Sequence, residues 1–449
     1  MKNDHTKNTG LALRSIYLKA AVLSVSLPLA MPVFADIDAA FEELDKQVES
    51  QYGAKATTAQ PKSEFEQWRQ QQQAEYQDYK RKYYAALEDY KNAIKRQWGD
   101  AEVTDKKRWV EYSDDLQTKR VVDYEKNEIR ISVLDPAISD SKLQQLIDAN
   151  LAKMLQQTPN SAREADPVLK AVGSTKPSSD EQSRLAILQE VIDPSAQGSE
   201  QQRFQQSLET LKKQAVIKRP EASASQASAS ATKNTAPQPS ATGKDSGEQK
   251  TVSQKPASQP LLITIALPQN SIGRRAARYE ALVLQNAGKS QVDPSLVYAI
   301  MHTESAFNPM ARSHVPAYGL MQIVPESAGL DVSQRLYGEG RLFSADYLFN
   351  AGNNVQAGAT YINILYYSYL KGIKDPLSRT YCVIAAYNTG AGNVAKSFVG
   401  SRKLNKALPL INQLTPAQVY DTLVKKLPYQ ETREYLKRVV ERQKIYSKV

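Results

Sequence analysis

The chain has few residues of the kinds that bind metals or cross-link a fold. Its 449 residues include one cysteine, Cys382, which has no partner for an intrachain disulfide. Its three histidines, His5, His302 and His314, are too few to complete a Cys/His zinc site. Hydrophobic residues make up 41% of the chain, which suffices for packed cores but not for a polytopic membrane protein. We therefore expect neither a structural metal nor a cofactor.

Charge of one sign is not in large excess. Lys and Arg number 58 against 48 Asp and Glu, a net charge of +10. An excess of this size suits nucleic acid, an anionic membrane surface or an acidic polymer about equally, so charge alone does not indicate which of them is the partner.

The length predicts two or three domains at ~100 to 200 residues each.

Residues 1–35 have the pattern of a secretory signal peptide. A basic start precedes an apolar run over 20–35 that prolines interrupt, and Val33 and Ala35 place small residues at the minus-three and minus-one positions. We predict cleavage after Ala35. An uncleaved anchor helix, the alternative, needs about 20 clean apolar residues. No cysteine follows the run to carry a lipid. We expect export to a Gram-negative periplasm, with outer-membrane association left open and nucleic acid not a partner.

Residues 36–219 are predicted to form an α+β domain. Residues 61–99 read as one long helix whose aromatic and apolar residues recur every three or four positions. This aromatic stripe is either a platform for sugars or a packed helix face, and its helical spacing favours packing. Period-two alternation in residues 108–112, 119–124 and 128–133 predicts a small antiparallel sheet. Helical stretches are expected after this sheet and continue to about Lys218.

Residues 220–259 are rich in Ser, Ala and Pro and have no aromatic residue, so we predict a disordered linker. Residues 261–267 then form an isolated apolar strand, which needs hydrogen-bonding partners. The only predicted sheet lies upstream, so we assign residues 260–273 to the completion of that sheet. Residues 274–449 form a mainly helical domain, and the overall class is α+β.

A carboxylate continues the apolar face of one helix in this last domain. Asp293 and Pro294 form an N-cap and first helical position. Glu304 then shares a face with Val297 and Ile300, in the last turn of a helix that we expect to break at Pro309. Burial and the negative helix end both favour a protonated carboxyl there, as a proton donor requires. The alternative is a glutamate that reaches solvent at the helix end.

Three further motifs follow this glutamate. They are Gly319-Leu-Met-Gln322, Ala386-Tyr387-Asn388 with Gly390, and Glu431-Thr-Arg-Glu-Tyr435-Leu. Together with Glu304-Ser305, and in this order, they resemble the soluble lytic transglycosylase catalytic domain, which has a goose-type-lysozyme-like fold. The resemblance covers about residues 274–446. The first domain more loosely resembles the N-terminal domain of membrane-bound lytic murein transglycosylase C.

The resemblance implies an enzyme that cleaves the β-1,4 bond between N-acetylmuramic acid and N-acetylglucosamine without water, so peptidoglycan glycan strands are the expected partner. Glu304 would protonate the glycosidic oxygen and then deprotonate the muramoyl C6 hydroxyl, giving a 1,6-anhydro product. Tyr435 would hydrogen-bond near Glu304. The other residues carried over would bind the glycan or line its pocket: Ser305, Ser313, Gly319, Met321, Gln322, Tyr387 and Asn388. Met321 and Tyr387 could equally be plain core residues.

Two alternatives remain at this point. A water-using muramidase would share Glu304 and differ in its product. A non-catalytic glycan-binding scaffold would rely on the long aromatic helix instead. Cys382, on an apolar helix, is interpreted as a small buried hydrophobe, because no basic neighbour is apparent that would activate its thiol.

Overall fold

The computed structural model describes residues 64–193, 195–220 and 259–447. The predicted signal peptide and nearly all of the predicted linker lie outside these described residues. Among the residues that are described, no helix is both long enough and apolar enough to cross a membrane.

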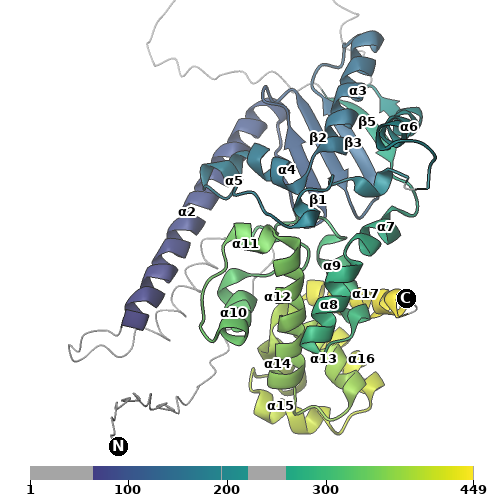
Figure 1. Ribbon diagram of the computed structural model, residues 1–449. Coiled ribbons are helices and arrows are strands. Elements are labelled where there is room, and N and C mark those ends of the chain that lie inside the picture. The colour runs from purple at the N-terminus through teal and green to yellow at the C-terminus, as the bar shows by residue number, and fades with distance from the viewer. Residues whose placement is uncertain (1–63, 194, 221–258, 448–449) are drawn as a thin grey trace, which may run out of the picture. The chain divides into compact units, whose positions relative to one another are not determined.

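The long helix predicted from the aromatic stripe is α2, Glu64–Trp98 (Figure 1). Its buried face includes Tyr76, Tyr83, Leu87 and Ile94. The rings of Tyr79 and Tyr83 stack with a centroid distance of 6.2 Å. The stripe is therefore a packed helix face, as its spacing favoured.

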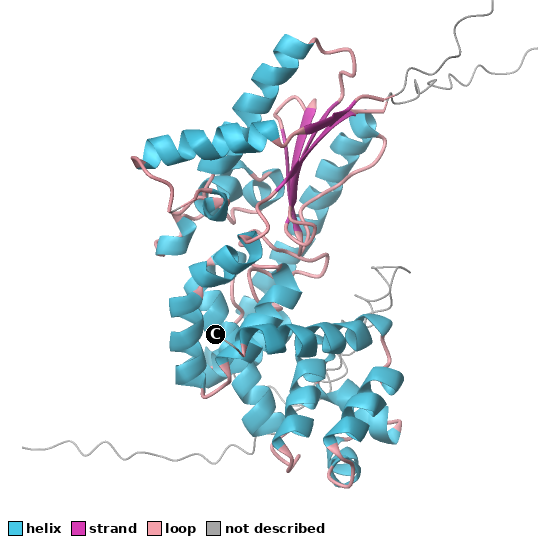
Figure 2. Ribbon diagram, turned by 90° about the vertical axis from the view of Figure 1, so that its right-hand side faces the viewer, coloured by secondary structure: helices cyan, strands magenta, loops and turns pink. Residues whose placement is uncertain are grey.

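The strands form one five-stranded antiparallel sheet in the order β1-β2-β3-β5-β4 (Figure 2). Strand β5 pairs with β3 over its whole length, from Leu261 opposite Val133 to Ala266 opposite Glu128. The chain thus returns to the upstream sheet after residues 221–258. Strand β4 was not expected: we predicted helix to about Lys218, and the last three residues of that stretch are a strand instead. The bounds are β1 Arg108–Tyr112, β2 Thr118–Asp123, β3 Glu128–Val133, β4 Val216–Lys218 and β5 Leu261–Ala266.

Short helices complete this first region and confirm its α+β class. Leu143, Ile147 and Leu151 recur along one face of α3 and are buried with the sheet residues. Capping boxes begin α4, at Thr158, and α6, at Ser199. The elements are α3 Asp140–Gln156, α4 Pro159–Ala165, α5 Pro167–Ala171, η1 Glu181–Ser183, η2 Gln189–Val191 and α6 Glu200–Lys213.

From Ser271 onward the described chain is mainly helical, with a long non-helical segment over residues 306–324 between α9 and η3. Side-chain caps followed by proline begin α9, α13 and α16, at Asp293, Asp375 and Thr415. The elements are α7 Ser271–Arg278, α8 Glu280–Ser290, α9 Pro294–Ser305, η3 Pro325–Gly329, α10 Leu330–Tyr337, α11 Ala345–Phe349, α12 Ala351–Ile364, η4 Leu365–Tyr369, α13 Pro376–Thr389, α14 Ala391–Val399, α15 Leu404–Ile411, α16 Pro416–Lys426 and α17 Gln430–Tyr446.

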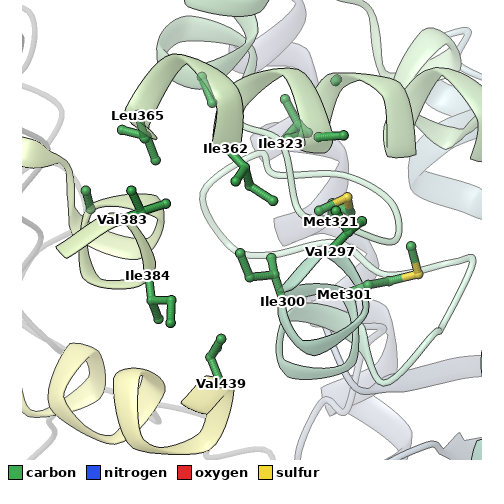
Figure 3. Packing of buried hydrophobic residues seen from close by; sticks show 14 of the residues in the cluster. Val297, Ile300, Met301, Met321, Ile323, Ile362, Leu365, Val383, Ile384 and Val439 are labelled. Atoms are coloured by element: carbon green, nitrogen blue, oxygen red, sulfur yellow. The ribbon is translucent and has the colours of Figure 1, made fainter. Parts of the chain in front are cut away.

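Helix α9 lies at the centre of the largest core cluster. Figure 3 shows its Val297, Ile300 and Met301 beside apolar residues of α12, α13 and α17. The same cluster includes Tyr83 and Leu87 of α2. A second core cluster, which contains buried residues of the sheet and of α3, includes Ala306 and Met310, which follow α9 in the chain. Apolar packing therefore joins the first region to the segment around Glu304.

Candidate active site

Helix α9 holds Glu304 inside the protein. The Asp293 side chain begins the helix by accepting a 2.8 Å hydrogen bond from the Ser295 N–H. Glu304 is only 5% exposed, so it continues the apolar face rather than reaching solvent. The helix ends at Ser305, earlier than the break expected at Pro309, because Ala306 adopts a φ of 50°. This left-handed turn fixes the carboxylate in the last turn of α9.

Two tyrosines and one lysine surround the Glu304 carboxylate. Burial, followed by the nearby Glu304 charge, raises the pKa of Tyr387 and of Tyr435 well above the ordinary value, so both hydroxyls keep their protons. The Tyr435 hydroxyl is buried and makes no hydrogen bond of ordinary length and angle among the described residues. It nevertheless lies close enough to the Glu304 carboxyl for hydrogen bonding to contribute to its raised pKa, so Glu304 is its nearest acceptor. Lys106 Nζ lies 3.8 Å from Glu304 Oε2.

Gly319 and Gln322 form a tight turn after α9. Gly319 has a φ of 73°, and a Cβ there would lie 2.5 Å from the Leu348 carbonyl oxygen, so only glycine fits. Gln322 also has a positive φ, of 50°. Its Nε2 donates a 2.9 Å hydrogen bond to the Gly319 carbonyl. Its Oε1 is buried with no partner in the described parts of the chain and remains available to a donor.

Asn354, on α12, is a site residue that the sequence analysis missed. Its side chain accepts a 2.8 Å hydrogen bond from the Met321 N–H and donates to the carbonyls of Tyr318 and Leu348 at 2.8 and 2.7 Å. The residue is fully buried. One amide thus satisfies three backbone groups of the surrounding loops. No signal in the sequence singled it out, because the same helix also contains Asn353, Gln356 and Asn363.

Met321 and Tyr387 contact each other. Tyr387 donates a 2.9 Å hydrogen bond from its hydroxyl to the Met321 carbonyl. The Met321 side chain is fully buried against Gly358, where an added Cβ would lie 2.1 Å from the sulfur. Of the two interpretations left open for Met321, its burial favours core packing. Tyr387 is half-buried and reaches both Met321 and the surroundings of Glu304.

The remaining sequence-predicted residues have other partners. Ser305 is fully buried, and its hydroxyl contacts the Met301 and Leu320 carbonyls at 3.1 and 2.8 Å, which ties α9 to the Gly319 turn. Ser313 hydrogen-bonds within its own loop, to Val315. Asn388 accepts a 2.7 Å hydrogen bond from Thr432, which joins α13 to α17. The structure therefore gathers Glu304, Tyr387 and Tyr435, whereas Ser305 has a structural role.

Basic side chains cover the end of α9. Lys107 Nζ donates to the His302 carbonyl at 2.9 Å, and Arg442 donates to the same oxygen at 3.1 Å. Cations stabilise the negative end of a helix. Burial lowers the pKa of Lys107 to about 7. Burial, then the charges of Arg442 and Lys107, lowers the pKa of the His302 imidazole to about 3, so this ring is neutral.

Helix α2 supports η3, the short helix that follows the Gly319 turn. Gln77 and Lys80 donate hydrogen bonds of 2.9 and 3.0 Å to the Glu326 carboxylate. The hydroxyls of Tyr79 and Tyr318 lie 3.3 Å apart. The first region is therefore in direct contact with both sides of the candidate site, through α2 and through the loop that carries Lys106.

Within residues 64–193, 195–220 and 259–447, no three His, Cys, Asp or Glu side chains lie close enough together to hold a metal ion. Cys382 is fully buried and has no disulfide partner, and burial raises its pKa, as expected for an apolar packing role.

Comparison with known proteins supports the resemblance drawn from the motifs. Residues 281–408 match the family described as Transglycosylase SLT domain. Residues 34–161 match the family described as Membrane-bound lytic murein transglycosylase C, N-terminal domain. The two matches lie in the two regions where the motifs and the sheet pattern led us to expect them. Glu304, Gln322 and Tyr387 fall within the first match, and Tyr435 lies beyond its end.

Curated relatives agree with these matches over part of their length. Over 186 residues, the chain is 45% identical to membrane-bound lytic murein transglycosylase C of Cronobacter sakazakii and 46% identical to that of Klebsiella pneumoniae. The aligned part is 41% of this chain and 51% of each relative, so the chain spans about half the length of the relatives it matches.

Among solved structures, an inactive mutant of the lytic transglycosylase Slt of Pseudomonas aeruginosa is 27% identical with a TM-score of 0.30, over 38% of this chain and 24% of that one. The soluble lytic transglycosylase Slt70 of Escherichia coli is 25% identical with a TM-score of 0.29, over 37% and 24%.

Proposed function

We propose that this protein is a peptidoglycan lytic transglycosylase that cleaves the β-1,4 bond between N-acetylmuramic acid and N-acetylglucosamine without water. The observation that carries the proposal is the buried Glu304 carboxylate at the end of α9, within the SLT match and beside the protonated hydroxyls of Tyr387 and Tyr435. A buried carboxyl among neutral donors is suited to acid-base work.

One carboxyl group can complete the reaction. Protonated Glu304 gives its proton to the glycosidic oxygen as the bond to C1 breaks. The resulting carboxylate takes the proton of the muramoyl C6 hydroxyl, and the C6 oxygen bonds to C1 as a 1,6-anhydro ring. Glu304 is then protonated again, so the cycle needs no water and no second carboxylate.

The chain's other residues would serve substrate and acid in different ways. Tyr435 would donate a hydrogen bond from its hydroxyl to Glu304 once the carboxylate forms, and would keep its own proton. Gln322, whose buried Oε1 lacks a partner among the described residues, would accept a hydrogen bond from an N-acetyl N–H or a sugar hydroxyl. Asn388 and Ser313 remain candidate glycan contacts, and Gly319 shapes the turn that presents Gln322.

A water-using muramidase is the second candidate, because one further carboxylate lies near. Glu431 Oε1 is 4.0 Å from Lys106 Nζ, which in turn is 3.8 Å from Glu304. A hydrolase with two carboxylates would need Glu431 to activate water. Its side chain is 62% exposed, a poor setting for a tuned base. If the protein is a transglycosylase, Glu431→Gln should keep most of the activity. If it is a hydrolase with two carboxylates, Glu431→Gln should lose its activity.

Clearance of purified sacculi tests whether the protein is an enzyme at all. The parent should lower the turbidity of the suspension, and Glu304→Gln should do so at least ~10²- to 10⁴-fold more slowly, as expected when an acid-base group is removed. The variant should still sediment with sacculi, because the amide preserves shape. A parent that binds sacculi and never clears them would instead be the non-catalytic scaffold.

We also propose that the protein acts in the cell envelope. The relatives are named membrane-bound, and the sequence predicts export with cleavage after Ala35. Sequencing of the mature protein from cell fractions tests this proposal. Asp36 at the N-terminus of a periplasmic form supports it, whereas a retained Met1 or a form confined to the cytoplasm would refute it.

A further inference from the structure

One charged group beside Glu304 comes from outside the region that matches the SLT domain. Lys106 lies in the loop between α2 and β1, within the N-terminal match. Its Nζ is 3.8 Å from Glu304 Oε2 and 4.0 Å from Glu431 Oε1. Within the described parts of the chain this ammonium pairs with both carboxylates and hydrogen-bonds to neither, since both distances exceed hydrogen-bond length.

The loop that carries Lys106 is fixed on both sides. Within it, Asp105 Oδ1 accepts hydrogen bonds of 2.8 and 2.7 Å from the N–H groups of Lys107 and Arg108. Asn308 donates from its side chain to the Lys106 carbonyl at 3.4 Å. Lys107, the next residue, is bound to the last turn of α9 through the His302 carbonyl. These contacts fix the backbone of Lys106, from which its side chain reaches Glu304 and Glu431.

From this geometry we infer that Lys106 is a positioning residue for Glu304, a cation that the N-terminal region places beside the catalytic carboxyl. The inference rests on the proposed function. A cation at 3.8 Å attracts the negative charge that Glu304 carries after it has given its proton to the glycosidic oxygen. Lys106 therefore stabilises the carboxylate between the first step and the second.

Other groups also face Glu304, and their effects differ from that of Lys106. Tyr387 on α13 and Tyr435 on α17 are protonated and carry no charge. Lys107 interacts with Glu304 at longer range, and its pKa of about 7 leaves it only partly charged near neutrality. The positive charge of Arg438, on α17, makes a minor contribution that lowers the pKa of Tyr435 and of Lys107. Among these groups Lys106 alone forms an ion pair with Glu304.

The effect of Lys106 on Glu304 can be tested without disturbing the fold. The Lys106 side chain is 36% exposed, so its replacement should leave the fold intact. Lys106→Met removes the charge and keeps much of the length, whereas Lys106→Arg keeps the charge. Lys153→Met is a matched control, because Lys153 is a half-exposed lysine of the same region that pairs with Glu111 rather than with Glu304.

The test is the rate of sacculus clearance by the full chain, with binding to sacculi measured alongside by sedimentation. Lys106→Met should clear sacculi about 10-fold more slowly than the parent and still bind them equally well, because the negative charge left on Glu304 after proton transfer is no longer paired with a cation. Lys106→Arg keeps the cation and should keep the parent rate, and so should Lys153→Met.

A parent rate of clearance in Lys106→Met, or an equal loss of rate in Lys106→Met and Lys106→Arg, would overturn the inference. Such a result would leave the proposed function standing, provided that the parent clears sacculi and Glu304→Gln does not. A parent without clearance at any pH would refute the function itself.

Discussion

Asn354 is joined to the Met321 backbone by one hydrogen bond, in which the Asn354 Oδ1 accepts from the Met321 N–H at 2.8 Å. Two further hydrogen bonds from the same amide bind the Tyr318 and Leu348 carbonyls. The Gly319 turn and Gln322 therefore depend on a helix that carries none of the motif residues. This relation leads to the first prediction.

Asn354→Ala should destabilise the protein and lower its activity. It removes a hydrogen bond from three backbone groups beside a fully buried side chain, although the Tyr318 carbonyl still accepts one from the Ile323 N–H at 3.3 Å. Each buried group that is left unpaired costs about 1–3 kcal/mol. We expect a loss of at least about 2 kcal/mol in the free energy of unfolding, measured by urea denaturation. Asn353→Ala is the control, because that side chain makes one long hydrogen bond, 3.3 Å to Tyr347. Equal effects of the two substitutions would contradict the role given to Asn354.

Strand β5 should be essential to the sheet. Ile263 is fully buried opposite Ile131 of β3 and Ile217 of β4. Ile263→Ala should cost about 2–4 kcal/mol of unfolding free energy, because it opens a cavity in a packed core. Ile217→Ala removes the same atoms from a side chain that is 39% exposed and should cost less than half as much. Comparable losses would show that β5 is not part of the core that we describe.

Acid should weaken the fold through His302. Its folded-state pKa of about 3 lies below the ordinary value of about 6.5, so the neutral ring contributes stability above pH 6.5 that is lost as pH falls toward 3. Between pH 6.5 and 4 the loss is at most about 3 kcal/mol. His302→Gln should be less stable than the parent at pH 7 yet lose less stability on acidification. Parallel melting curves for the two proteins across this range would disprove the assignment.

Periodic features could be predicted from the sequence. The 35-residue helix α2 repeats its aromatic stripe over many turns, and the Asp293-Pro294 cap identified the start of α9. The lone apolar strand at residues 261–267 needed partners, and β5 finds them in β3 and β4. Strand β4 escaped prediction because its three residues are exposed and follow a helix directly.

Contacts between distant residues could not be predicted in this way. The approach of Lys106 to Glu304 joins positions 198 residues apart, and no local pattern marks it. Asn354 is one of several asparagines in this stretch, and its role appears only when the loops it binds are folded around it. Ser305 stood in the motif as a glycan contact, yet its hydroxyl is taken up by backbone carbonyls. Sequence patterns predicted Glu304 as the acid, whereas the residues that surround it could be found only in the folded structure.

The mass of the products released from purified sacculi tests the central claim most directly. If Glu304 alone carries the proton in both steps, the parent should release muropeptides that end in 1,6-anhydro-muramic acid, each lighter by one water than its hydrolytic counterpart. Glu304→Gln, folded and still bound to sacculi, should release almost none in the same time. Reducing-end muramic acid from the parent, or anhydro products from Glu304→Gln at the parent rate, would contradict the account.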